Sequence, residues 1–322
     1  MRRRAAQPVT ASPSFRLEAV AAARVAEMGG ALDAMLAGEL DAVIVREVFS
    51  ATESEGLVAA LRAQDSDLPV LNTGGTVIIG PPHPMGRFQP AEAAALFEAY
   101  LDAAGPWGPM LSALPHAPLA RVVDTFRALA GGRDVDLAHT DGGRPFSPGT
   151  FRGLAESKQM QIHRGLYFLQ LKTFETLARV VDCGNQLSAF MPIALPDDGG
   201  AIELFHASDY LSGAGTEQGE AGEISRELAE TIVREHPGQA LPVGRGDLLV
   251  FNGGRIYHRV SAVVGRGACR GPQQPTRVGH FYAGADHAFD DRFLHSPLLV
   301  VLDHRLVVAV RLRQTVAVHR FE

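Results

Sequence analysis

The chain of 322 residues has few cysteines, few lysines and no long apolar run. Its two cysteines, Cys183 and Cys269, do not form a disulfide framework or a cysteine-based zinc motif. No run of about 18 apolar residues is present, so the sequence predicts no membrane span. The basic start, Met1–Arg4, is not followed by the apolar segment of a signal peptide. We therefore expect a cytoplasmic protein without a membrane partner.

The chain also lacks an excess of positive charge, with 30 Lys and Arg residues against 36 Asp and Glu residues and a net charge of −6. Binding a nucleic-acid polymer needs a basic surface, so that class of partner is not expected. Lys158 and Lys172 are the only lysines, and the other 28 cationic residues are arginines. Arginine suits the planar recognition of a small anion. We expect a small-molecule substrate and leave the oligomeric state open.

Hydrophobic periodicity predicts a mostly helical first part of the chain. The first 14 residues have no pattern and are expected to form an irregular arm. The Gly-, Asp- and Pro-rich stretch Ala130–Gly149 is expected to be a loop. Residues 41–48 alternate as a half-buried strand does. Helices are expected over four ranges: 17–38, Glu53–Ala63, Pro90–Ala103 and Leu119–Ala130.

The pattern changes after residue 150 to short strands separated by Gly, Pro and Asp turns, which favours a jelly roll. A helix is expected over Glu220–Glu235, whereas Leu298–Val318 fits helix and strand equally. We expect an α+β fold with a double-stranded β-helix (jelly-roll, cupin-like) core in one domain, divided into residues 1–150, 151–290 and 291–322. The expected strands are Met160–His163, Gln186–Leu195, Ala201–His206, Asp247–Phe251, Ile256–Val264 and Thr276–Ala283.

Two segments could supply the first ligand of an iron(II) site that uses two histidines and one carboxylate. His139-Thr140-Asp141 has the usual His-x-Asp spacing but lies in the expected loop. His163-Arg164-Gly165 follows a strand, which would hold a ligand rigidly, but has no acid. His258, which follows another apolar strand, is the second histidine. The residues alone leave the choice between His139 and His163 open.

Two segments resemble the iron(II)/2-oxoglutarate halogenases that chlorinate hapalindole- and welwitindolinone-type alkaloids. They are Asn185–Ile193 (NQLSAFMPI), followed by Gly199-Gly200, and Gly246–Val260 (GDLLVFNGGRIYHRV). The similarity includes His163-x-Gly165 and extends over most of the chain. It implies a jelly-roll core with added helices, and His163 and His258 as the iron ligands.

The resemblance also implies a role for Gly165. In that family a glycine replaces the carboxylate ligand, and chloride takes the coordination position that the acid would fill. 2-Oxoglutarate and O2 then generate an oxidant that removes hydrogen from an unactivated C–H bond, and the carbon radical takes the chloride. Arg277 and Arg152 are the candidates for binding 2-oxoglutarate. Arg164 and Ser188 are candidates for binding substrate.

The substrate is predicted less directly. The Arg-, Ala- and Gly-rich composition is typical of actinomycetes, and an actinomycete branch of this family chlorinates C2′ of 2′-deoxyadenosine 5′-monophosphate in 2′-chloropentostatin-type antibiotic biosynthesis. We expect this nucleotide ahead of an indole-alkaloid-like substrate. A hydroxylase of the same superfamily, which could use His139 and Asp141, and a non-catalytic jelly-roll binding protein are the other hypotheses.

Overall fold

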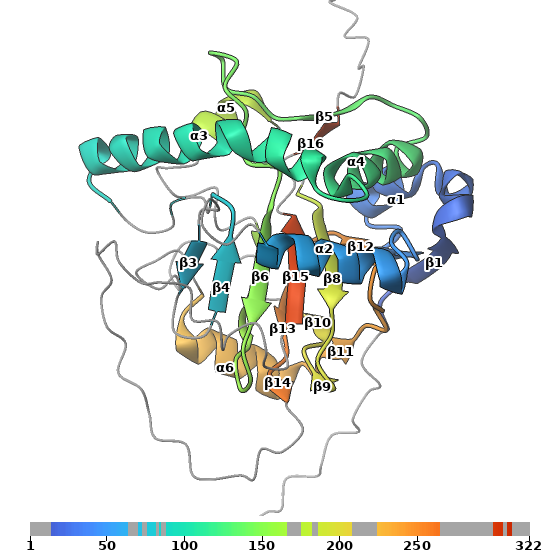
Figure 1. Ribbon diagram of the computed structural model, residues 1–322. Coiled ribbons are helices and arrows are strands. Elements are labelled where there is room, and N and C mark those ends of the chain that lie inside the picture. The colour runs from blue at the N-terminus through green and yellow to red at the C-terminus, as the bar shows by residue number, and fades with distance from the viewer. Residues whose placement is uncertain are drawn as a thin grey trace, which may run out of the picture.

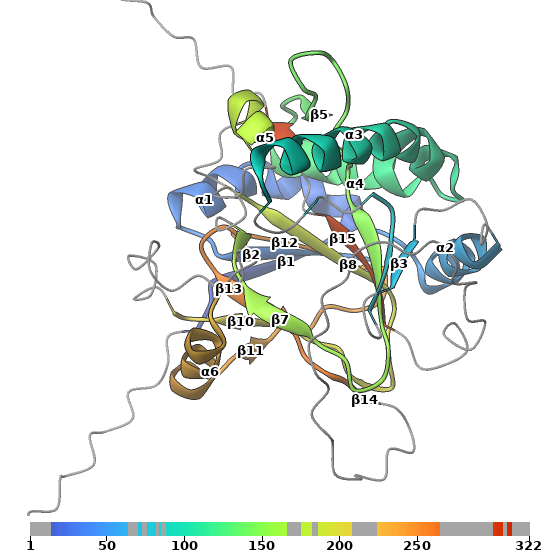
Figure 2. The ribbon, with the colours of Figure 1, turned by 90° about the vertical axis from the view of Figure 1, so that its left-hand side faces the viewer.

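The computed structural model describes residues 14–63, 70–72, 76–81, 84, 88–165, 175–181, 186–207, 224–264, 299–304 and 308–310. The expected arm, except for its last residue, and the expected strand Thr276–Ala283 with Arg277 lie outside these residues. The fold is α+β, with two facing β-sheets and helices on both sides (Figures 1 and 2). Within the described residues, no helix is long and apolar enough to cross a membrane.

The larger sheet has eight strands drawn from nearly the whole sequence. Only the edge pair β1–β2 is parallel among the ladders described for it. In spatial order, the strands are β1 (Leu17–Ala21), β2 (Ala42–Arg46), β12 (Leu248–Phe251), β8 (Ser188–Ala194), β15 (Leu299–His304), β6 (Thr150–Leu154), β4 (Thr76–Ile79) and β3 (Val70–Asn72).

The smaller sheet has four strands, in the order β11 (Gln239–Ala240), β10 (Ile202–Phe205), β13 (Tyr257–Val260) and β7 (Met160–His163). All three of its ladders are antiparallel. Two short ladders complete the described strands: β9 (Asp198–Gly199) with β14 (Val263–Val264), and β5 (Val135–Leu137) with β16 (Val308–Val310).

Side-chain alternation divides the core into two main layers, because successive residues of a strand point to opposite faces. On the large sheet, the outward residues pack under the helices and the inward residues face the small sheet. The outward set includes Val43, Val45, Leu248, Val250, Ala189 and Met191. The inward set includes Ala42, Ile44, Leu249, Phe251 and Phe190, which pack with Ile202, Leu204 and Val260 of the small sheet.

Helices cover the outer face of each sheet (Figure 2). Apolar residues of α1 (Ala31–Ala37), α2 (Ala51–Ala63), α3 (Pro90–Ala113) and α4 (Pro118–Leu129) belong to the core layer over the large sheet, next to the 3₁₀ helix η1 (Ala22–Met28). On the other side, α6 (Arg226–Glu235) packs Ile232 against Tyr257 and Phe205 of the small sheet. The short α5 (Glu175–Val180) lies beside α3.

Several expectations for the first part of the chain hold, and two need correction. The strand near 41–48 and the helices at 53–63 and 119–130 are confirmed by β2, α2 and α4. The helix expected over 17–38 is wrong at its start, because Leu17–Ala21 pairs with β2, and Gly29-Gly30 separates η1 from α1. The helix that begins at Pro90 runs ten residues further than expected, through Pro106 and Pro109.

Strands β3, β4 and β6 were not expected, and β5 interrupts the loop expected over 130–149. The first part of the chain therefore supplies strands to the large sheet as well as helices. The ambiguous C-terminal stretch contains two strands, β15 and β16. β15 lies in the middle of the large sheet, between β8 and β6, which explains its apolar sequence. The helix expected at 220–235 is confirmed from Arg226 onward by α6.

Candidate active site

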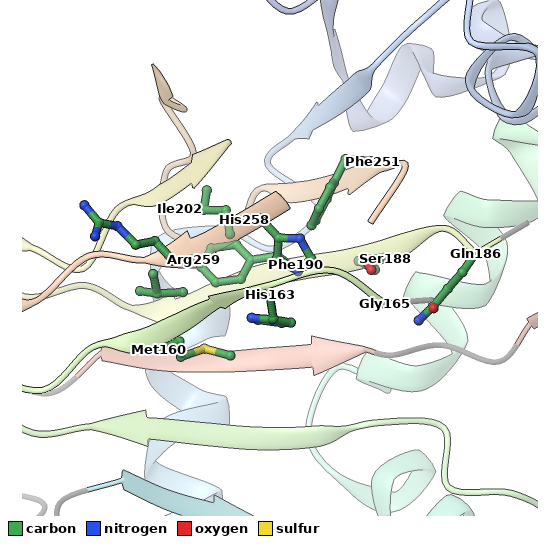
Figure 3. Close-up of a pocket in the computed structure, with 12 residues that line it drawn as sticks. Met160, His163, Gly165, Gln186, Ser188, Phe190, Ile202, Phe251, His258 and Arg259 are labelled. Atoms are coloured by element: carbon green, nitrogen blue, oxygen red, sulfur yellow. The ribbon is translucent and has the colours of Figure 1, made fainter. Parts of the chain in front are cut away.

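Two histidines face each other across neighbouring strands of the small sheet. His163 at the end of β7 is paired in register with His258 of β13, and the two ring centroids are 4.3 Å apart. Both line one cavity between the sheets (Figure 3). The Phe251 ring of β12 meets the His258 ring edge-on at 4.7 Å, which limits the positions that this imidazole can take.

A bulge in the β7–β13 ladder brings both imidazoles to the inner face. His258 and Val260 are two residues apart on β13, whereas their partners His163 and Met160 are three residues apart on β7. In a regular strand, a spacing of three places side chains on opposite faces. The extra residue of the bulge offsets this alternation, so that Met160 and His163 both line the cavity.

Each histidine is oriented by a main-chain carbonyl two residues earlier in the sequence. Nδ1 of His163 lies 2.7 Å from the carbonyl oxygen of Gln161, and Nδ1 of His258 lies 2.9 Å from that of Ile256. A carbonyl oxygen only accepts, so Nδ1 donates in both rings, and Nε2 is the nitrogen that would bind a metal. Metal-ligating histidines are oriented in this way. Two imidazoles on adjacent strands therefore fit a divalent iron ion.

The position two residues after His163 has no acid and little room for one. The Gly165 N–H donates to the carbonyl oxygen of Gly253 at 2.7 Å, which ties the end of β7 to the turn before β13. A Cβ atom at position 165 would overlap the side-chain amide of Gln186, whose Oε1 and Cδ are nearer to it than Nε2, at 2.6 Å. In the described part of the chain, no cluster of three or more His, Cys, Asp or Glu side chains could hold a metal.

The rest of the cavity wall is mainly apolar, and no carboxylate is among its described lining residues. Ser188, at the start of β8, is buried in this wall, where its side chain fills the space that a Cβ atom at Gly253 would need. Arg259 lines the cavity too, but its guanidinium donates to Glu203 at 2.6 Å. The other lining residues are Met160, Ala189, Phe190, Ile202, Phe251 and Val260.

The structure does not bring the candidate arginines into this wall. Arg152 of β6 is half-buried and shares a strand face with Leu154, which packs in the core between the sheets. Arg164 is buried with its guanidinium over the ring of Tyr257, 5.4 Å from the centroid, on the side of the small sheet that α6 covers. Arg277 lies outside the described residues. His163, Gly165, Ser188 and His258 are thus the expected site residues that share one cavity.

The alternative ligand pair lies elsewhere. His139 forms an isolated bridge with Pro145, and Asp141 lines a different hollow, between α3 and α5. The described residues of that hollow include no histidine. His139 and Asp141 are therefore not joined there by the second histidine that an iron site of this type needs.

Sequence reasoning gave no role to Gln186, whose amide lies beside Gly165. It belongs to the segment Asn185–Ile193, but a glutamine just before a strand has no recognisable ligand spacing. Its position depends on the packing of the turn at Gly253-Gly254 against β8. The Gly254 N–H donates to the Gln186 carbonyl oxygen at 2.9 Å. A sequence pattern does not encode this contact.

Comparison with known proteins identifies the family. The family described as carrier-protein-independent halogenase WelO5 matches residues 15–283, which is most of the chain. The chain belongs to this family. It is an enzyme of the iron(II)- and 2-oxoglutarate-dependent halogenases, with iron, 2-oxoglutarate and chloride as cofactors. No curated protein matches the chain.

Solved structures with a similar arrangement are distant in sequence. An oxidoreductase of the 2OG-Fe(II) oxygenase family from Burkholderia pseudomallei is 12% identical, with a TM-score of 0.40, over 89% of this chain and 93% of that one. An N-substituted L-amino acid dioxygenase from Burkholderia ambifaria AMMD, in complex with alpha-KG, is 17% identical, with a TM-score of 0.46, over 74% and 83%. A Pseudomonas putida prolyl-4-hydroxylase is 13% identical, with a TM-score of 0.37, over 73% and 91%.

Proposed function

We propose that this enzyme chlorinates an unactivated aliphatic C–H bond, with iron held by His163 and His258. The observation that carries the proposal is one cavity lined by both imidazoles and by Gly165, with no acid among its described lining residues. Two nitrogen ligands and a bidentate 2-oxoglutarate leave iron(II) with two coordination positions. A carboxylate at position 165 would take one of them. Glycine leaves that position for chloride, and O2 takes the other.

With its cofactors bound, the centre supplies an oxidant that removes a hydrogen atom from the substrate, and chloride is then transferred to the carbon radical. The overall reaction balances as R–H, Cl⁻, H⁺, O2 and 2-oxoglutarate giving R–Cl, H2O, CO2 and succinate. The chain's own residues orient the two ligands through the carbonyls of Gln161 and Ile256. The apolar wall around Phe190 and Phe251 excludes water, which would compete with chloride for the metal.

The anionic end of 2-oxoglutarate requires a cation, and a bidentate arginine suits a carboxylate. Arg152 is favoured by its place on the strand face that points between the sheets. Arg277 is kept as the other candidate. Ser188 is proposed as a polar contact for substrate, because its buried side chain lines the cavity. Arg164 is a weaker candidate, because its guanidinium covers Tyr257 instead.

We propose 2′-deoxyadenosine 5′-monophosphate as the substrate, chlorinated at C2′ in nucleoside antibiotic biosynthesis in the cytoplasm. The abundance of arginine supports a phosphate-bearing ligand, whereas the apolar cavity wall favours the alternative, an indole-alkaloid-like compound. We further propose that the two facing sheets form the jelly-roll core of a single domain, residues 1–322. The smaller sheet carries both metal ligands.

The test is mass spectrometry of a substrate panel incubated with enzyme, iron(II), 2-oxoglutarate, chloride and air. The panel contains deoxynucleotides, the matching nucleosides and indole alkaloids. A product with the isotope doublet of one chlorine, separated by about two mass units, identifies both reaction and substrate. A hydroxylated product alone in saturating chloride identifies a hydroxylase. Absence of succinate with every substrate favours a non-catalytic binding protein.

A further inference from the structure

The side chain of Gln186 fills the space next to the iron ligands that a side chain at position 165 would need. A Cβ atom at Gly165 would overlap the Gln186 amide group, including Oε1, Cδ and Nε2. Figure 3 shows this amide beside Gly165 at the end of the cavity that contains both histidines. The absence of a side chain at position 165 therefore has two effects: it removes an acid and it admits an amide.

Main-chain hydrogen bonds fix the backbone on both sides of this amide. The main-chain carbonyl oxygen of Gln186 accepts from the Gly254 N–H at 2.9 Å. The main-chain carbonyl oxygen of the neighbouring Gly253 accepts from the Gly165 N–H at 2.7 Å. Three segments, the end of β7, the start of β8 and the turn before β13, are thus joined around one point. Within the part of the chain described, Oε1 of Gln186 is buried and has no hydrogen-bond partner.

A buried acceptor that lacks a partner is destabilising, so the unpaired Oε1 at this place points to a partner, or a rearrangement of the amide, when ligands bind. The two ends of an amide differ in what they bind: Nε2 donates two hydrogen bonds and Oε1 accepts. Oε1 is the amide atom nearest to the place of a Cβ at position 165, and a half-turn about the last side-chain bond, which moves no other atom, brings Nε2 there instead. A neutral donor stabilises an anion nearby, whereas a carboxylate of the same shape would repel it.

We propose that Gln186 is a halide-positioning residue, whose Nε2–H group donates a hydrogen bond to the halide bound in the place left by Gly165. The inference rests on the proposed function, because it assumes that a halide binds at the metal. Gln186 favours chloride because its uncharged amide lies beside that place, where a carboxylate would repel the anion. It acts on the halide and not on the C–H bond.

The first experiment measures halide binding without turnover. The enzyme is loaded with iron(II) and 2-oxoglutarate in the absence of O2, and chloride is titrated while the iron-to-2-oxoglutarate charge-transfer absorption is followed. Gln186→Leu keeps the approximate volume and removes the donor, and we expect its chloride dissociation constant to rise about tenfold, as for one lost hydrogen bond to an ion. Gln186→Glu should show no halide response. The control is Gln89→Leu, since Gln89 is exposed and makes no capping bond at α3.

The outcomes separate this inference from the proposed function. If the unmodified enzyme shows no halide response, the proposed function fails. If it responds and Gln186→Leu binds chloride equally well, only the role of Gln186 fails. Iron content and melting temperature are measured for each variant. A Gln186→Leu protein that folds but loses iron would make the amide a metal ligand and would overturn the assignment.

A second experiment tests occupancy of the space with no cofactor present. Gly165→Ala adds one methyl group and no ligand, so its effect on stability reports the overlap with the Gln186 amide. Because the overlapped atoms are the end of a flexible side chain, we expect Gly165→Ala to lower the melting temperature slightly, and Gln186→Ala to remove most of that loss when the two are combined. Such coupling is measured by a double-mutant cycle. Additive effects of the two substitutions would show that the Gln186 amide is not held beside Gly165.

Discussion

Two short segments of this chain each start with a histidine but have different surroundings in the fold: His139-Thr140-Asp141 and His163-Arg164-Gly165. In both, the Nδ1 atom lies close to a main-chain carbonyl oxygen two residues earlier, that of Leu137 at 2.9 Å and that of Gln161 at 2.7 Å. Only the first segment has the acid that an iron site usually needs. Only the second has another histidine opposite it, His258.

The two segments differ in what the neighbouring strand supplies. β13 supplies His258 at the same level as His163, and the bulge in β7 turns His163 toward it. His139 instead lies opposite Pro145, in a loop that Arg144 fastens to α3 through Glu98 and Asp102. A His-x-Asp sequence in a loop does not form an iron site unless a second element holds another histidine next to it.

The largest expected effect is on iron binding. His258→Ala removes one of the two proposed nitrogen ligands, and we expect the purified protein to lose stoichiometric iron. His139→Ala is the matched control, because it removes an imidazole with the same carbonyl contact from the other segment. Iron content measured by elemental analysis checks both. Full iron in His258→Ala, or loss of iron in His139→Ala, would reverse the assignment of the two segments.

The next effect concerns the acid that one segment has and the other lacks. Gly165→Asp restores a His-x-Asp sequence on β7, and we expect it to abolish chlorination and give hydroxylation. Hydroxylation should be stronger when Gln186→Ala is added, because the aspartate then has the space to reach the metal. Gly142→Asp is the control in the loop, where a Cβ makes only ordinary contact, at 3.8 Å from Thr140 Oγ1. Undiminished chlorination by Gly165→Asp, measured by mass spectrometry, would contradict the argument for a vacant ligand position.

A third, smaller effect separates the arginines of the two regions. Arg152→Gln removes the cation proposed for the carboxylate of 2-oxoglutarate, and we expect its KM for 2-oxoglutarate to rise by about 10- to 100-fold, as for loss of a bidentate ion pair. Arg144→Gln, in the loop region, should leave this KM unchanged. Succinate formation at increasing 2-oxoglutarate concentration gives both values. An unchanged KM in Arg152→Gln would transfer the proposed role to Arg277.

Local patterns predicted much of the fold and part of the site. β7 was predicted to the residue, and β2, β8, β10 and β12 within a few residues, because each is a short apolar run bounded by turn residues. Leu17–Ala21 was mistaken for helix, because pairing with β2 overrides its helical periodicity. The undecided C-terminal stretch formed β15, whose conformation depends on the strands on either side of it.

Local patterns had the same limit for the candidate site, whose geometry depends on contacts between segments that are distant in the sequence. The family resemblance selected His163 and His258, and the structure then placed them opposite each other on adjacent strands. The bulge that makes this possible is invisible in the sequence, because it is a property of the β7–β13 pairing. Gln186 was overlooked for a related reason: its importance arises from one glycine on β7 and from the turn at Gly253, which are distant in sequence and close in space.

The smallest expected effect is on the stability of the loop region. Arg144 donates to Glu98 at 2.5 Å and to Asp102 at 2.6 Å; the two acids are exposed to solvent and Arg144 is partly exposed. Exposed ion pairs contribute little, so Arg144→Gln should lower the free energy of unfolding by about 0.5 to 1 kcal/mol. The difference should shrink in high salt, because screening weakens such pairs. Urea unfolding at two salt concentrations measures it. A loss several times larger, or one accompanied by loss of iron, would mean that the loop supports the metal-binding strands, and the two regions would no longer be independent.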